Sequence, residues 1–157
     1  MRIELTVTEA VELARAAGGL PPFVRTVTGE DDGVHVTLDL RRVPDAPSAL
    51  RVAARLVPVV RATLRLESFV AGTAVVAVEA NAAGLPAHKL LGVAQGPLQA
   101  ALRSRGLPPD ALHVLPDARV AVDVQALAEA AAGDRLPAVR LTDVAYTEGT
   151  VHAEAEL

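Results

Sequence analysis

Strict alternation of apolar and polar residues recurs along this chain and predicts β-strands, because successive side chains of a strand point to opposite faces. The clearest alternating runs start at residues 2, 34, 60, 74, 119 and 151. The runs at 60–67 and 74–80 flank a turn near Ala71-Gly72, which predicts a hairpin. A further short strand is predicted at 23–28, ahead of a hairpin loop at 29–33.

Spacings of three and four between apolar residues predict helices in the segments between these strands. Thr6-Val7-Thr8-Glu9 has the form of a capping box, and Gly18-Gly19 would end the helix that follows it. Residues 49–57 have the same helical spacing. Asp123 is well placed as the N-cap of an alanine-rich helix that ends at Gly133.

The longest helical pattern covers residues 85–106, where an apolar stripe occupies one face. Pro86 suits the first turn and Gly106 suits the C-terminal cap, so we predict a helix at 85–105. Pro97 lies in its middle and predicts a kink or a break. Two interpretations stay open, a kinked core helix or a helix that lines a groove or a subunit contact.

The order strand, helix, hairpin recurs in residues 34–80 and 118–157, on either side of this helix. Residues 36–40 (Val-Thr-Leu-Asp-Leu) match residues 120–124 (Val-Ala-Val-Asp-Val). The pattern indicates an internal repeat whose copies are joined by the helix at 85–105, although shared strand patterning also explains part of the match.

We therefore predict an α+β fold in a single domain over residues 1–157. A hairpin with one apolar face is not stable alone and needs a partner to cover that face. Two such halves solve the problem if they form a curved antiparallel sheet packed on the long kinked helix.

Composition changes this picture in one respect, because 51% of the residues are hydrophobic and only 2% are aromatic. The core must therefore be built from Ala, Val and Leu. Such a composition can reflect the base composition of a genome, but smooth aliphatic walls would also suit an acyl chain. The lack of aromatic side chains argues against base stacking on nucleic acids.

Charge is unevenly distributed in a chain whose formal net charge is −4. Residues 41–65 carry six arginines against one acidic residue, Asp45. A local basic patch on an acidic protein can bind an anion or a lipid headgroup, and it can equally be a solvated face. The candidate headgroup ligands are Arg51, Arg55, Arg61 and Arg65.

No catalytic or metal-binding motif is present in the sequence. There is no cysteine, and the four histidines do not form the paired spacings of zinc sites. The three serines lie outside any nucleophile-elbow sequence, and Gly-rich phosphate loops are absent. We expect a protein that is not an enzyme and that holds no cofactor and no metal.

Part of the chain resembles a known family. The segments concerned are 83–86 (Ala-Gly-Leu-Pro), 119–124, 140–144 and 149–151. They are similar to bacterial members of the tubular lipid-binding (BPI-like) superfamily, a group that resembles the phospholipid-binding proteins of mycobacterial mannan elongation. The resemblance implies a curved sheet that wraps a long helix and leaves an apolar groove for acyl chains. Its members are mostly secreted or membrane-tethered, and no site residue carries over.

The sequence leaves two function hypotheses. The first is non-enzymatic binding of a lipid or another apolar small molecule in an aliphatic groove on the long helix. The second is a homodimeric interaction or scaffold protein with no small-molecule ligand, in which strand edges at 23–28 or at the C-terminus pair between subunits. Nucleic acid is a weaker partner on grounds of charge, and a cytoplasmic location is expected because no signal or transmembrane pattern is seen. The residues predicted to line the groove are Leu90, Leu91, Ala94, Leu98 and Leu102.

Overall fold

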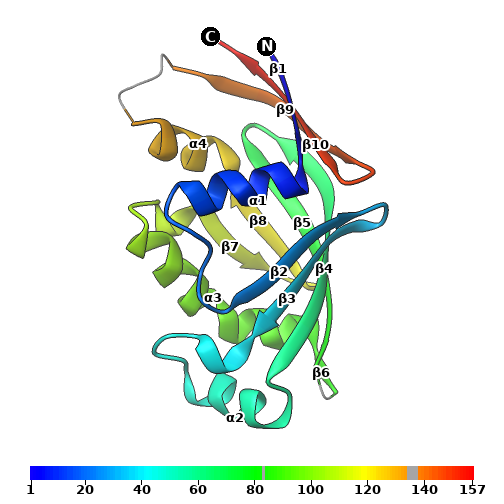
Figure 1. The fold of residues 1–157 in the computed structure, drawn as a ribbon, viewed down its shortest axis with the longest axis vertical. Coiled ribbons are helices and arrows are strands. Elements are labelled where there is room, and N and C mark those ends of the chain that lie inside the picture. Colours follow the sequence, from blue (N-terminus) through cyan, green and yellow to red (C-terminus); the bar gives the residue numbers. More distant parts are fainter. Residues whose placement is uncertain (83, 134–137) are drawn as a thin grey trace.

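The computed structural model describes residues 1–82, 84–133 and 138–157, and within them the strands form two antiparallel sheets (Figure 1). The larger sheet has the order β2-β3-β4-β5-β8-β7, with β6 paired to β5. Its strands are β2 (Val24–Glu30), β3 (Gly33–Asp39), β4 (Val59–Val70), β5 (Thr73–Ala82), β6 (Leu85–Pro86), β7 (Leu112–Leu115) and β8 (Arg119–Asp123). The smaller sheet has the order β1-β10-β9, formed by β1 (Arg2–Thr6), β9 (Arg140–Thr147) and β10 (Thr150–Glu156).

Helices connect the strands and link the two sheets. They are α1 (Val7–Ala16), α2 (Ser48–Leu56), α3 (Ala87–Ser104) and α4 (Val124–Ala132), with short 3₁₀ turns η1 (Leu40–Arg42) and η2 (Pro109–Ala111). Helix α1 leads from the smaller sheet to the larger one, and α4 leads back. Figure 1 places α2 at the end of the molecule far from the smaller sheet, where the two chain termini meet. The α+β class predicted from the sequence is confirmed.

The predicted helix caps of α1 and α4 are confirmed. Thr6 Oγ1 accepts a hydrogen bond from Glu9 N at 3.1 Å, and the Glu9 carboxylate accepts one from Thr6 N at 2.8 Å. The Asp123 carboxylate accepts a hydrogen bond from Ala126 N at 2.9 Å. Gly133 has a φ of 58°, so a glycine ends α4 as expected.

Helix α3 begins two residues later than the sequence predicts. Leu85 pairs with Ala82 and Pro86 adopts an extended conformation, so these two residues form β6 instead of a first helical turn. The helix then runs from Ala87 to Ser104 with Pro97 inside it. The kink at this proline stays a prediction.

The two segments predicted as a repeat share their element order but differ in strand pairing. In the first, β3 is followed by α2 and pairs with β4, within one sheet. In the second, β8 is followed by α4 but pairs with β5 and β7, whereas β9 and β10 belong to the smaller sheet. The internal duplication therefore stays a prediction.

The two sheets meet where the turns of their hairpins approach each other. Val7 N, at the start of α1, donates a hydrogen bond of 3.0 Å to Gly149 O in the turn between β9 and β10. A Cβ atom on Gly29 would lie 2.9 Å from Gly149 Cα and from the Val7 side chain. Only glycine fits at position 29 without displacing backbone.

The core consists of small aliphatic side chains on one face of the larger sheet and on α2. The main buried cluster comprises Leu40, Leu50, Ala53, Ala54, Val60 and Ala82, and a second comprises Ala62, Val78 and Val120. Helix α3 packs against both clusters through partly buried leucines and a valine, yet none of its own residues is buried. Among the described helices, none combines the length and apolarity needed to cross a bilayer.

Candidate functional site

An aliphatic cavity of about 110 Å³ lies between α3 and the inner face of strands β3, β4 and β5. Every residue that lines it is apolar. The alternation of each strand accounts for this lining, because the inward positions carry aliphatic residues. The sheet contributes Leu38, Val60, Ala62, Val78 and Ala80.

Four of the five residues predicted to line a groove form the helical wall of this aliphatic cavity. They are Leu90, Leu91, Ala94 and Leu98. Leu102 lies farther along α3 and lines a different hollow of about 620 Å³, together with Leu20, Leu107 and Leu112. The stripe read from the sequence thus spans two neighbouring spaces, which share Leu98 as a common wall.

Hollows flank α3 on more than one side of the aliphatic cavity. One of about 390 Å³ shares Leu50 and Leu90 with the cavity, and another of about 430 Å³ shares Phe23 and Pro97. A helix on a sheet usually buries an apolar stripe at close-packed density. Helix α3 packs on the sheet with residues that are partly buried at most, and these hollows lie beside it.

An arginine hollow of about 680 Å³ lies beside the aliphatic cavity at the α2 end of the larger sheet. Arg51 and Arg55 on α2 line it together with Arg41 on η1, and Asp45 is the acidic residue of the lining. Leu40 and Val43 line both spaces, so the arginine hollow and the aliphatic cavity share a wall.

Arg41 is held in place by Asp39, the buried acidic residue at the end of β3. Asp39 is 4% exposed, and its two carboxylate oxygens accept hydrogen bonds from Arg41 Nε at 3.0 Å and Nη2 at 3.1 Å. It also accepts one from Arg41 N, which caps η1. These hydrogen bonds from Arg41 hold the pKa of the Asp39 carboxyl below its ordinary value.

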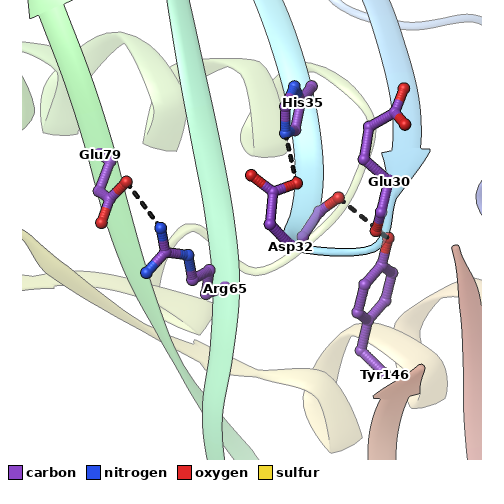
Figure 2. A network of polar contacts seen from close by, with 7 residues as sticks. Glu30, Asp32, His35, Arg65, Glu79 and Tyr146 are labelled. Carbon is purple, nitrogen blue, oxygen red and sulfur yellow. Dashed lines mark hydrogen bonds and ion pairs between the residues drawn. The ribbon is translucent and has the colours of Figure 1, made fainter. Parts of the chain in front are cut away.

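Arg61 and Arg65, the other two predicted headgroup ligands, lie elsewhere. Both are exposed on β4, on the face opposite the buried Val60 and Ala62. Arg65 Nη2 donates a hydrogen bond of 2.8 Å to Glu79 on β5, as Figure 2 shows. The structure brings Arg51 and Arg55 together and separates them from Arg61 and Arg65.

Further paired polar groups lie at and beside the β2–β3 turn (Figure 2). His35 Nε2 lies 2.7 Å from Asp32 Oδ1, and this hydrogen bond is the main cause of the lowered pKa of Asp32. Tyr146 on β9 donates its hydroxyl to Glu30 O at 2.5 Å and to Gly33 O at 3.0 Å, so it joins the smaller sheet to the β2–β3 turn. These groups hold structure together, since each has a partner within the protein.

Sequence reasoning missed the part of the site that comes from the segment between β3 and α2. Leu40, Arg41 and Val43 lie at or after the end of the alternating run that starts at residue 34 and before the helical spacing of residues 49–57, and their position depends on η1. The one available signal was Leu40, which is the last apolar residue of the alternating run that starts at Val34.

Comparison of the sequence with protein-family models and with curated proteins, and of the structure with solved structures, finds no match. Within the described part of the chain, no three His, Asp or Glu side chains are grouped so that they could hold a metal ion. The molecule is thus an α+β protein with an aliphatic cavity beside an arginine hollow.

Proposed function

We propose that this protein binds a lipid or a similar apolar small molecule in the aliphatic cavity under α3, without chemical conversion of it. The proposal rests on the lining of the cavity, because every residue that the sheet and α3 contribute to it is apolar. Each buried methylene group would contribute about 0.8 kcal/mol to binding, so about ten of them correspond to the roughly 8 kcal/mol of micromolar affinity, before the cost of association.

The size of the cavity bears on how such a ligand would enter. Small-molecule sites usually measure about 300–1,000 Å³, so a space of about 110 Å³ accepts only part of a ligand. The hollows beside it share the walls Leu50, Leu90, Phe23 and Pro97. A displacement of α3, whose residues are partly buried at most, would join these spaces into a longer groove.

The test is to identify what the purified protein carries and what it takes up. Native mass spectrometry before and after organic extraction is expected to reveal a bound apolar molecule, and titration with fatty acids is expected to refill the extracted protein. A protein that is free of ligand after purification and takes up neither fatty acid nor phospholipid would refute the proposal.

A matched pair of variants tests whether the ligand binds in the aliphatic cavity. Ala94→Leu adds volume inside the cavity and is expected to weaken binding at least about tenfold by occupying the space of the ligand. Ala16→Leu makes the same change at an exposed position on α1 that lines none of these spaces, and it should bind like the unaltered protein. Equal binding by both variants would place the ligand elsewhere.

The second candidate function, a homodimeric interaction protein, draws on the edge of the larger sheet. In the described residues, β2 pairs with a strand on one side only, whereas the C-terminal strand β10 lies between β1 and β9 and has no free edge. An exposed edge can pair with a second copy of the chain. Light scattering of the dilute protein decides this: a monomer at every concentration would refute the dimer.

A further inference from the structure

We propose that the ligand is an amphiphile with one anionic group, a phosphate monoester or a carboxylate, and that Arg51 and Arg55 bind this group in the arginine hollow. The inference rests on the proposed function, because the apolar part of the same ligand would occupy the aliphatic cavity. It adds the chemical class of the head and the residues that select it.

The geometry of α2 brings the two arginines together. Residues four apart on a helix lie one above the other on the same side, and Arg51 and Arg55 both line the hollow. Ala54, between them in sequence, is buried and anchors this side of the helix to the core. Two guanidinium groups so placed can donate paired hydrogen bonds to one phosphate or carboxylate.

The two arginines are available for an anion. Arg51 donates to Ser48 Oγ at 3.3 Å, and in the described chain neither Arg51 nor Arg55 has a carboxylate within 4.0 Å. Arg41, the third arginine of the hollow, is already paired with Asp39. With the Arg41–Asp39 pair counted as neutral, the lining keeps an excess of one positive charge, from Arg51 and Arg55 against Asp45, which attracts an anionic group.

The shared wall connects head and chain. Leu40 and Val43 line both the arginine hollow and the aliphatic cavity, so an anionic group held by α2 would lie next to the cavity that takes the apolar chain. The small volume of the cavity favours a single chain over two. A one-chain amphiphile would therefore satisfy the charged and the apolar space at once.

Three probes separate the contributions of head and chain: decyl phosphate, 1-decanol and inorganic phosphate, each titrated calorimetrically below any micelle concentration. Decyl phosphate is expected to bind at least about tenfold more tightly than 1-decanol, as two charge-assisted contacts would give. Inorganic phosphate is expected to bind more weakly than decyl phosphate, because it lacks the chain.

The variant Arg51→Gln/Arg55→Gln is expected to remove the preference for decyl phosphate and to leave 1-decanol binding unchanged, which also reports that the variant is folded. The matched control Arg61→Gln/Arg65→Gln removes the same charge from the outer face of the sheet and should keep the preference.

Each other result has a defined meaning. If both ligands bind equally, or the Arg51/Arg55 variant keeps the preference, the anionic site is refuted while apolar binding stands. If neither decyl phosphate nor 1-decanol binds, the proposed function and this inference both fail. If inorganic phosphate binds as tightly as decyl phosphate, the hollow takes free phosphate and the amphiphile is refuted.

Discussion

The two faces of strand β4 differ sharply, although their residues alternate within one short segment. Val60 and Ala62 point inward, are buried, and form part of the aliphatic cavity. Arg61 and Arg65 point outward, where Arg65 pairs with Glu79 across the sheet. The inner face determines the packing and the cavity, whereas the outer face satisfies its charges within the sheet or in solvent.

The same comparison explains the division of the arginines. Arg51 and Arg55 have the four-residue spacing of Arg61 and Arg65, but one pair lies on a helix and the other on a strand. Four residues span about 6 Å along a helix and about 13 Å along a strand. The two arginines of α2 are therefore much closer together along the backbone than the two of β4, and this difference could not be read from the arginine pattern alone.

The largest expected effect comes from placing a charge on the inner face. Val60 is 3% exposed, so Val60→Asp would bury an unpaired carboxylate and lower the free energy of unfolding by about 3–5 kcal/mol. Val70 lies on the same strand but is 70% exposed, and Val70→Asp should change it by less than about 0.5 kcal/mol. Urea denaturation of both variants measures the contrast, and similar losses would mean that the two faces are not distinct.

The next effect concerns Asp39 and depends on pH. The folded-state pKa of Asp39 is lowered, chiefly by the side-chain hydrogen bonds from Arg41. Its contribution to stability is therefore present above the unfolded pKa of about 4 and is lost as pH falls through the lower folded value. Asp39→Asn should destabilise the protein at neutral pH and flatten its stability profile below pH about 4.

Thermal unfolding across pH 2–7 measures this profile for the two proteins. Asp45→Asn, which alters the acidic residue that lines the arginine hollow, provides the comparison. If stability falls as steeply below pH about 4 in Asp39→Asn as in the unaltered protein, Asp39 is not the cause of that loss.

A smaller effect is expected where Tyr146 joins the two sheets. Tyr146→Phe removes the donor to Glu30 O and Gly33 O and should cost about 1 kcal/mol of unfolding free energy. In this variant, hydrogen exchange should become faster in the β2–β3 turn than it is in the unaltered protein, and it should change less in β4. No change in either measurement would show that the hydroxyl contacts contribute nothing to the junction of the sheets.

The smallest effect belongs to the outer ion pair. Arg65 and Glu79 are both largely exposed, so a double-mutant cycle of Arg65→Gln and Glu79→Gln should give a coupling energy of about 0.5 kcal/mol that declines with added salt. A coupling above about 2 kcal/mol would place this pair in a much less solvated setting than the outer face.

Sequence patterns were sufficient for elements with strong local signals. The capping box at Thr6, the N-cap Asp123 and the hairpin of β4 and β5 follow from spacing and turn chemistry alone. The start of α3 was misplaced because Leu85 and Pro86 gain a strand partner, which is a tertiary contact that no local pattern reveals.

The candidate site was predicted in part, for a comparable reason. The helical stripe identified four residues of the cavity, since a period of 3.6 residues fixes which side chains share a face. The opposite wall comes from β3, β4 and β5. Which strand residues face α3 depends on how the sheet packs against the helix, and this is a tertiary contact. The arginine hollow depends further on η1, a short turn whose shape is set by the contact between Arg41 and Asp39.

The unfilled space beside α3 has a consequence for the stability of the protein under pressure. Unfolding eliminates internal voids, so a protein with unfilled space beneath a long helix should lose volume when it unfolds, and hydrostatic pressure should favour the unfolded chain. A molecule that fills the void would remove this volume difference. Occupancy of the cavity would thus be visible as resistance to pressure, independently of any spectroscopic property of the ligand.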